Sequence, residues 1–458
     1  MNPALVCGLI MLLGTIVLLC IGAPISISIG LPSAVALLAV LAPDKAFLVS
    51  AQKIFTGTNS FSLLAIPFFI LAGNIMNNGG IARRLVNCAQ LLTGRIPGSL
   101  AQTNIVTNML FGAISGSGSA AAAAIGGIMG PIEEEEGYDK GYSAAVNIAS
   151  APTGMMIPPS NTLIVYSTVA GTVSISALFF AGYMPGILWG IGNMIVAGIM
   201  AARLGYISKR EKIPFIKALL MVLDAIPSLF LIFIIIGGIL GGAFTATETS
   251  AIAVVYALLL STIYKVIASW QDSKKEGAAP FNLGRAIIGA FSDLPKMLLD
   301  SANMTSIILL MIGMSSIMSY VMTFTGLPKI IATALLSLTS NKIAILLLIN
   351  LFLLVLGTFM DPTPAILIFT PIFLPIVQSF GMNAVHFGLM MTYNLCIGAI
   401  TPPVGTVMFT GVRVANTTIE TVIRKLLPFF AVTILILMLV TYIEPITMWL
   451  PRLFELVA

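Results

Sequence analysis

The 458-residue sequence has little charge and few of the side chains that carry enzymatic chemistry. Only 9% of its residues are charged and one is histidine, whereas 58% are hydrophobic. This composition excludes an ordinary soluble domain, and several apolar runs are long enough to cross a hydrocarbon core about 30 Å thick. Because backbone groups must be satisfied inside lipid and the runs lack the alternation of a membrane barrel, we expect an all-α polytopic membrane protein.

The absences also exclude several functions. The four cysteines have no paired spacing, so neither a disulfide framework nor a metal site is predicted. No nucleophile–base pair, nucleotide-binding loop or zinc spacing is present, which indicates that the chain is not an enzyme. The net charge of +5 comes from basic residues in loops between apolar runs, where they set orientation rather than bind nucleic acid. The first hydrophobic run lacks a basic leader and is too long for a cleaved signal, so we expect it to remain as the first span.

An internal repeat organises the chain. The stretch FGAISGSGSAAAAAIGGIMGP at 111–131 is matched 244 residues later by VLGTFMDPTPAILIFTPIFLP at 355–375. Each stretch is followed at the same distance by an interrupted segment, APTGMMIPPSNT at 151–162 and LCIGAITPPVGT at 395–406. One ungapped register matches Pro375 to Pro131, Gly381 to Gly137, Gly398 to Gly154, Pro402 and Pro403 to Pro158 and Pro159, and Thr406 to Thr162.

The repeat predicts two homologous halves with ten crossings and two re-entrant hairpins. The first half covers residues 1–202, with a hairpin at about 98–135 and a broken helix at about 142–169. A basic linker follows at 203–224, and the second half covers 225–458, with a hairpin at about 342–378 and a broken helix at about 384–412. Five crossings in each half give the halves opposite orientations, so the repeats are inverted.

The basic residues indicate the orientation. With this topology, 17 of the 22 lysines and arginines lie on one side of the membrane, which the positive-inside rule makes cytoplasmic. The other side holds only Lys45, Lys53, Lys329, Lys342 and Arg452. Both termini are then periplasmic, and the two hairpins enter from opposite sides so that their tips converge near the midplane.

The interrupted segments point to transport. A helix broken inside the bilayer leaves amides and carbonyls free to bind ions and anionic groups, and inverted repeats with such breaks are typical of secondary transporters. Pro158 and Pro159, like Pro402 and Pro403, remove amide donors and clash with the preceding turn. A simple kinked span is the alternative for each proline pair, although two pairs in repeat register favour true breaks.

Asp361 is the most informative single residue, because a carboxylate at the centre of a span costs roughly 2.5 to 3.5 kcal/mol. Two roles are open for it. It can bind a cation directly or through a neighbour, or it can simply cap the helix that begins at Pro362. Sodium prefers hard oxygens, which Ser115, Ser117, Ser119, Thr358 and Thr401 supply near the two hairpin tips.

Other polar residues favour structural roles. Thr245 and Glu248 have the spacing of a capping box. Glu133 to Glu136 are expected to form a solvated helix end, and His386 is expected to have a boundary or a packing role. The spacings Gly112xxxGly116 and Gly126xxxGly130 favour close helix packing.

These motifs resemble the large membrane (M) subunit of a tripartite ATP-independent periplasmic (TRAP) transporter. The similarity covers nearly the whole chain and rests on several motifs in order. They are LLAIPFFILAGNIMNNGGIARRL at 63–85, SGSGSAAAAAIG at 115–126, GYDKGYSAA at 137–145, IPPSNTLIVYS at 157–167, FTATETSAIAVVYAL at 244–258, MDPTPAILIFTPIFLPI at 360–376 and IGAITPPVGT at 397–406.

The resemblance implies an elevator-type sodium symporter with a scaffold and a moving domain. Its two sodium sites would fall on Ser115, Ser117 and Gly154, and on Gly357, Asp361, Gly398 and Thr401. Substrate would lie between them, near Ser160, Asn161 and Thr162. One departure concerns the first hairpin, where family members often carry an acidic residue and this chain has Ala121, so that the first sodium site lacks a carboxylate.

The resemblance also implies partners: a small four-helix membrane Q subunit and a periplasmic substrate-binding P subunit that delivers an organic acid, such as a C4-dicarboxylate, sialic acid or another sugar acid. Such a complex resides in the bacterial cell inner membrane. A stand-alone ion-coupled carboxylate carrier or antiporter of the same superfamily, which needs no binding protein, remains the alternative. A membrane scaffold without transport activity would leave the inverted repeat and the broken helices unexplained.

Overall fold

The computed structural model describes residues 3–94, 96–171, 173–206, 214–240, 243–274, 281–338, 341–402 and 405–457. Within these ranges every regular element is a helix. The prediction of an all-α membrane protein is therefore confirmed for the described chain.

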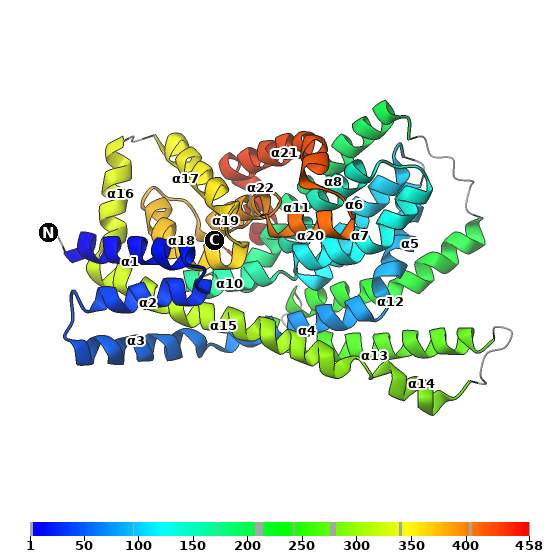
Figure 1. The fold of residues 1–458 in the computed structure, drawn as a ribbon, viewed down its shortest axis with the longest axis horizontal. Coiled ribbons are helices and arrows are strands. Elements are labelled where there is room, and N and C mark those ends of the chain that lie inside the picture. Colours follow the sequence, from blue (N-terminus) through cyan, green and yellow to red (C-terminus); the bar gives the residue numbers. More distant parts are fainter. Residues whose placement is uncertain are drawn as a thin grey trace.

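One group of helices forms the lower layer in Figure 1. Within it α1 packs on α2, the long α15 crosses α2, α3 and α4, and α13 packs on α4 and α12. Its members are α1 (Pro3–Cys20), α2 (Ile25–Leu37), α3 (Pro43–Thr58), the 3₁₀ turn η1 (Phe61–Leu64), α4 (Ala65–Asn78), α12 (Phe215–Leu240), α13 (Ala246–Asp272), α14 (Leu283–Ala290) and α15 (Leu294–Thr325).

A second group lies above it in Figure 1 and contains both hairpins and both interrupted helices. Its core is the buried α19, which packs on α11, α17, α18 and α21. The members are α6 (Ser99–Ser115), α7 (Gly118–Glu135), α8 (Lys140–Ser150), α9 (Thr153–Met156), α10 (Asn161–Ala170), α11 (Ile175–Leu204), α17 (Lys342–Gly357), α18 (Pro362–Ser379), α19 (Ala384–Gly398), α20 (Thr406–Val414), α21 (Ile419–Tyr442) and α22 (Pro445–Leu453).

Two further helices, α5 (Ile81–Thr93) and α16 (Leu327–Leu338), connect the layers at opposite ends of the molecule (Figure 1). The first packs on α12 below and α6 above, and the second on α15 below and α18 above. Each follows a lower-layer helix and precedes a hairpin, so the two helices are equivalent connectors in the two halves.

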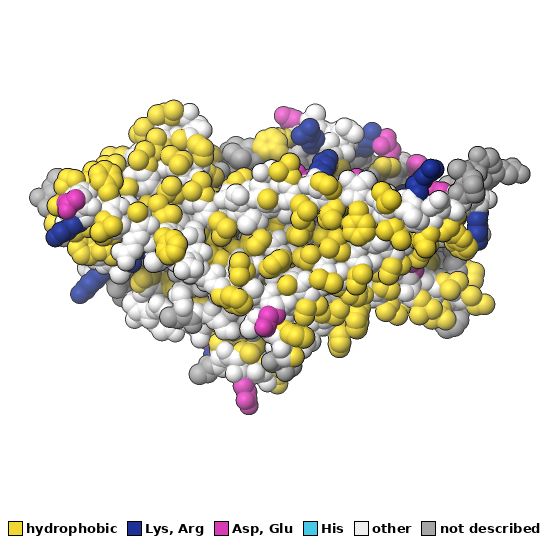
Figure 2. Space-filling model, turned by 90° about the horizontal axis from the view of Figure 1, so that it is seen from below, with side chains coloured by type: hydrophobic (Ala, Val, Ile, Leu, Met, Phe, Trp, Pro, Cys, Tyr) yellow, Lys and Arg dark blue, Asp and Glu magenta, His cyan; other side chains and the backbone are white. Residues whose placement is uncertain are grey.

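Seven described helices, including α1, α11 and α18, are long and apolar enough to cross a membrane by length and composition. Six of them coincide with crossings that the sequence predicts at about 3–22, 175–201, 225–243, 247–264, 304–322 and 426–446, and the seventh, α18, is an arm of the second hairpin. Figure 2 shows hydrophobic side chains covering the middle of one face, with most charged side chains toward its rim. The lower layer also has large exposed hydrophobic side chains, such as Leu259 on α13 and Ile307 on α15. A surface of this kind is stable against lipid rather than water.

The repeat is visible in the helices themselves. The pair α6–α7 corresponds to α17–α18, and the interrupted run α8–α9–α10 corresponds to α19–α20. The halves also pack on each other. The second arm of the first hairpin, α7, packs on α20, and the second arm of the second hairpin, α18, packs on α10. Pro402 lies in the break between α19 and α20, and Pro403 lies outside the described residues.

Three predictions about single polar residues can be compared with this packing. Thr245 and Glu248 form the expected capping box at the start of α13. His386 is buried, with its ring nitrogens 2.6 Å from Thr447 Oγ1 and 3.1 Å from the Thr441 carbonyl oxygen, so it joins α19 to α21 and α22. Both structural interpretations are confirmed.

The prediction of a solvated Glu133 is wrong. Glu133 is 1% exposed, and Asn104 donates a hydrogen bond to its Oε1 at 3.2 Å, whereas Glu134 to Glu136 are exposed as expected. The reason is that the end of α7 packs against both α6 and α8. One position in the last turn must therefore face inward, and helical periodicity gives that position to Glu133.

Candidate functional site

The first hairpin reverses direction over only two residues. Helix α6 ends at Ser115, Gly116 adopts a left-handed conformation with φ of 62°, and Ser117 caps α7 by accepting a hydrogen bond from the Ala120 amide at 3.3 Å. Ser115 and Ser117 are thus held at the tip, and a β-carbon on Gly116 would lie 3.1 Å from Asn161 Nδ2. The tip therefore contacts the beginning of α10.

In the break between α9 and α10, side-chain hydroxyl groups form hydrogen bonds with the free backbone groups. Ser160 donates to the Met155 carbonyl oxygen, lies 2.8 Å from Thr162 Oγ1 and caps α10 by accepting from the Leu163 amide at 3.4 Å. Thr162 donates to the same Met155 carbonyl at 3.3 Å. Ser160 is fully buried. Its hydroxyl fixes the angle between α9 and α10.

Two glycine pairs join the hairpins to the breaks. A β-carbon on Gly112 would lie 2.6 Å from the Gly154 α-carbon, and one on Gly398 would lie 2.4 Å from the Gly357 carbonyl carbon. A side chain on Gly112, Gly154 or Gly398 therefore requires the backbone to shift. Gly154 and Gly398 are equivalent in the repeat, whereas Gly357 lies one position beyond the equivalent of Gly112, so each half has a similar but not identical glycine crossing. For Gly112 this confirms the close-packing interpretation of its motif.

The second hairpin tip lies on the second break. Thr406 donates to Asp361 Oδ1 at 3.1 Å, and the Gly405 amide donates to the Thr358 carbonyl oxygen at 3.3 Å. Asp361 occupies the N-cap position of α18, and its carboxylate also faces Thr406 at the start of α20. Helix capping and cation binding therefore both stay open as roles for Asp361. Thr401 lies in the same break and donates to the Ile397 carbonyl oxygen at 2.7 Å.

Both hairpin tips and the first break meet at one cavity of about 490 Å³, between the two helix groups. The lower layer contributes α4 and α15 to its wall. The lining comprises Ile70, Gly73, Asn74, Asn77, Phe111, Ser115, Gly116, Ser117, Gly118, Ser119, Ala120, Met155, Asn161, Thr162, Met304, Ile308, Asp361, Thr363, Thr406 and Val407.

The cavity separates the predicted site residues into two sets. Five of the ten line it: Ser115, Ser117, Asn161, Thr162 and Asp361. The other five lie behind the wall, in the breaks or at the crossings: Gly154, Ser160, Gly357, Gly398 and Thr401. The predicted convergence of the two tips is present.

Four helices begin at this cavity. The first residues of α7, α10 and α20, which are Gly118, Asn161 and Thr406, line it directly, and α18 begins between the lining residues Asp361 and Thr363. Helix N-termini carry partial positive charge and free amides, and they attract anions. The C-termini of α6 and α17 lie at the same tips, and their carbonyl oxygens favour cations.

The side chains of the cavity have one formal charge, that of Asp361, within the described chain. The Asn161 side-chain oxygen is buried and accepts no hydrogen bond from any described residue. Hydroxyl, amide and carboxylate oxygens are hard ligands suited to an alkali-metal ion. The cavity therefore combines donors for an anion with unpaired oxygen acceptors for a cation.

Sequence reasoning missed the contribution of the lower layer. Asn74 and Asn77 of α4 line the cavity, and the Asn74 side-chain amide donates to Ser301 Oγ of α15 at 2.7 Å. The signal was present as polar residues near the end of an otherwise apolar run, in LAGNIMNN at 71–78. The sequence indicated Thr406, which contacts Asp361, only as the repeat equivalent of Thr162.

With this geometry in place, comparison with known proteins identifies the family. The family model described as "Tripartite ATP-independent periplasmic transporter, DctM component" matches residues 12–446. The chain belongs to the DctM family. It is accordingly a multi-pass membrane protein, the large permease component of a TRAP transporter.

Relatives agree with this membership. This DctM-family chain is 51% identical over 438 residues to the uncharacterised protein YgiK of Salmonella typhimurium, covering 96% of this chain and 95% of that one. It is 36% identical over 436 residues to the C4-dicarboxylate TRAP transporter large permease protein DctM of Vibrio cholerae, covering 94% and 95%. Among solved structures, the YdaH transporter of Alcanivorax borkumensis has a similar fold, with a TM-score of 0.60, 14% identity and 89% coverage of both chains.

Proposed function

We propose that this permease imports an organic acid together with sodium, and that the helix group containing both hairpins moves against the lower layer as an elevator. The observation that carries the proposal is the cavity on which four helix N-termini and one carboxylate converge. The substrate class is a C4-dicarboxylate, sialic acid or another sugar acid. The Vibrio cholerae relative, named for C4-dicarboxylates, supports this class.

The anion would be held mainly by backbone. Within the described chain no lysine or arginine lines the cavity, so the amides at the starts of α7, α10 and α20 are its main donors. The side-chain amide of Asn161 adds a donor beside them. A site built from helix starts accepts many carboxylates, and this is consistent with selection of the substrate by a separate protein.

Sodium would be held at the two tips. At the second tip, Asp361 supplies a carboxylate already oriented by Thr406, and the ends of α17 and α19 supply carbonyl oxygens beside the Gly357–Gly398 crossing. At the first tip, Ser115 and Ser117 supply hydroxyl oxygens without a carboxylate. Bound sodium would supply the positive charge that lets an anion occupy a cavity in which Asp361 is the one charged side chain among the described lining residues.

Asp361→Asn tests this function. In proteoliposomes containing this chain and its small Q subunit, we expect wild type to accumulate the transported acid only with an inward sodium gradient. The substitution keeps the side-chain shape and removes the charge, so the half-saturating sodium concentration should rise about tenfold or more. Asp44→Asn, an exposed carboxylate at the start of α3, is the matched control and should leave uptake unchanged. Full sodium-dependent uptake by Asp361→Asn would refute a role for Asp361 in coupling.

The same preparation distinguishes the proposed tripartite system from a stand-alone carrier. We expect uptake to require the periplasmic P subunit in addition to the Q subunit. Uptake of the same acid by this chain alone, at the same rate, would favour the stand-alone carrier.

A further inference from the structure

A second cavity lies outside the site described above. It has a volume of about 580 Å³ and is bounded by α3, by the end of α10 and by α15. Its lining is mainly hydroxylic, with Thr56, Ser60, Ser167, Thr168, Ser315, Ser316, Ser319, Tyr320 and Thr323, and it also contains Lys53, Gly57, Val169, Gly171, Val173 and Ile312. None of these residues was assigned a role from the sequence beyond the side of the membrane given to Lys53.

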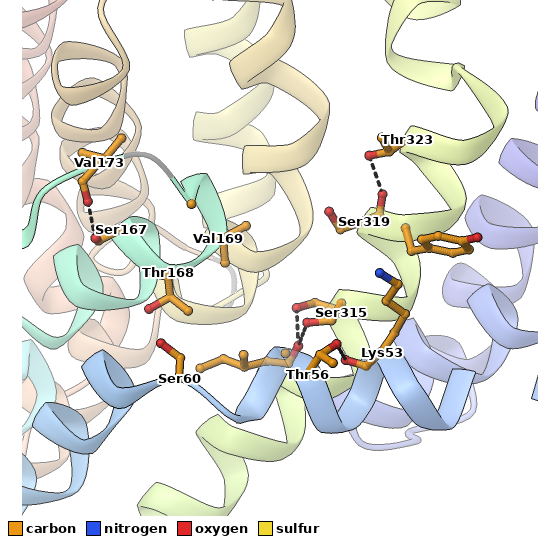
Figure 3. Close-up of a pocket in the computed structure, with 15 residues that line it drawn as sticks. Lys53, Thr56, Ser60, Ser167, Thr168, Val169, Val173, Ser315, Ser319 and Thr323 are labelled. Carbon is orange, nitrogen blue, oxygen red and sulfur yellow. Dashed lines mark hydrogen bonds between the residues drawn. The ribbon is translucent and has the colours of Figure 1, made fainter. Parts of the chain in front are cut away.

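The charge of this second cavity is opposite to that of the first. Lys53 is its one ionisable lining residue apart from the Tyr320 phenol, and no aspartate or glutamate lines it within the described chain. The Lys53 amine lies 4.6 Å from the centre of the Tyr320 ring, which holds it by a cation–π contact. Figure 3 shows the Lys53 side chain extending from α3 toward Ser319 of α15, with Ser167 and Thr168 on α10 across the cavity.

Lys53 has no carboxylate partner among the described residues. The Lys53 side chain is partly buried. The hydroxyls of Ser60 and Ser319, which also line the cavity, donate a hydrogen bond to no described atom. Many of the other hydroxyls donate to carbonyls of their own helix, as Ser316 does to the Ile312 carbonyl oxygen at 2.8 Å. The α10 C-terminus adds partial negative charge at this end. Lys53 is therefore the group that makes the cavity attractive to an anion.

The two cavities follow one another along the same pair of helices. On α10, Asn161 and Thr162 line the first cavity, whereas residues from Ser167 onward line the second, and the whole helix is about 15 Å long. On α15, Met304 and Ile308 line the first cavity and Ile312 to Thr323 the second. The second cavity lies toward the side that the basic residues assign to the periplasm, so it continues the substrate site outward.

We propose that this second cavity is an outer anion site, in which Lys53 receives the carboxylate of the organic acid before it reaches the hairpin tips. The identification of the ligand as an organic acid rests on the proposed function. The positive potential of the cavity does not rest on it and can be measured without knowing the substrate.

The first experiment measures that potential with charged thiol reagents. Ser319→Cys is introduced with Cys20→Ser, because Cys20 is the one exposed native cysteine and the other three are buried. The rate of modification by an anionic methanethiosulfonate sulfonate is divided by the rate for a cationic trimethylammonium analogue. Adding Lys53→Gln should lower this ratio about tenfold, because each rate responds to the potential in the opposite direction.

Lys45→Gln is the matched control, since Lys45 is exposed on the same helix and does not line the cavity. This variant and Lys53→Arg should both keep the ratio within about twofold of the parent. An equal ratio in Lys53→Gln and Lys45→Gln would overturn the proposal. So would failure of both reagents to reach position 319 in protein that elutes as a single folded species, since the cavity would then be closed to anions.

The second experiment tests the ligand. In uptake assays with succinate, or with N-acetylneuraminate if succinate is not transported, Lys53→Gln should raise KM about fivefold and change kcat by less than about twofold. Lys53→Arg should restore most of the loss, and Lys45→Gln should match wild type. An unchanged KM in Lys53→Gln would reject the carboxylate site. If wild type transports neither acid, it is the proposed substrate class that fails, and the thiol measurement still decides the potential of the cavity.

Discussion

The absence of β-carbons at two glycine crossings lets the hairpins pack closely against the interrupted helices. At the two crossings, the β-carbon of an alanine at position 112 would lie 2.6 Å from the Gly154 α-carbon, and at position 398 it would lie 2.4 Å from the Gly357 carbonyl carbon. Both neighbours are backbone and cannot rotate away. We therefore expect Gly112→Ala and Gly398→Ala to cost about 1 to 3 kcal/mol of folding free energy and to abolish most uptake.

Gly127→Ala is the control for this prediction. Gly127 is also helical, in α7, but a β-carbon there meets nothing within 4 Å, so the substitution should be neutral or slightly stabilising. The measurement is thermal unfolding in detergent together with sodium-driven uptake. Equal stability of all three variants would mean that the crossings tolerate a side chain.

At the scale of elements, function depends on how a helix is interrupted as well as on where. The angle between α9 and α10 is fixed by the Ser160 and Thr162 hydroxyls on the Met155 carbonyl oxygen, although Ser160 does not line the cavity. We expect Ser160→Ala to cost about 1 kcal/mol for the lost cap and also to raise KM several-fold, because Asn161 and Thr162 are displaced with the start of α10.

Ser174→Ala separates the loss of a helix cap from the displacement of Asn161 and Thr162. Ser174 caps α11 in the same way, accepting from the Ala177 amide at 3.4 Å, but it lies away from the cavity. Its loss should lower the melting temperature by a similar amount and leave KM unchanged. If both variants shift KM equally, the effect belongs to general destabilisation and not to the break.

At the scale of the whole molecule, the coupling ratio decides how transport responds to membrane potential. Concentrating an acid a thousandfold costs about 4.1 kcal/mol, and each net positive charge that enters at 100 mV contributes about 2.3 kcal/mol. A dianion therefore needs more than two sodium ions before an interior-negative potential can help. The two sodium ions proposed at the hairpin tips balance only the dianion, and Asp361 leaves one further negative charge in the cavity. We therefore expect a third sodium ion to enter with the acid and uptake to be electrogenic.

Potassium-loaded vesicles with valinomycin test this directly. Imposing an interior-negative potential should accelerate uptake of a dianion at a constant sodium gradient, and clamping the potential at zero should remove the acceleration. Equal rates under the two conditions would show electroneutral coupling with two sodium ions per dianion.

The sequence by itself determined the class of molecule and the plan of its site. Low charge and long apolar runs require helices in lipid, and the repeat of glycine and proline at a spacing of 244 residues placed both hairpins and both breaks. It also identified Asp361, Ser115 and Ser117, and the resemblance to TRAP M subunits implied Asn161 and Thr162; all five line the cavity. These features follow from local chemistry, because glycine, proline and an isolated carboxylate constrain the backbone wherever they occur.

Only the tertiary structure decided which polar groups face the same space. Ser160 and Thr162 are two residues apart, yet one closes a break and the other lines a cavity, and Glu133 is buried beside three exposed glutamates. Asn74 and Lys53 join their cavities only because α15 packs on α4 and α3. The contacts of Asn74 and Lys53 join segments more than 200 residues apart, whereas Glu133 is covered by the neighbouring helices α6 and α8. In both cases helical periodicity in one segment does not specify which partner will cover each face.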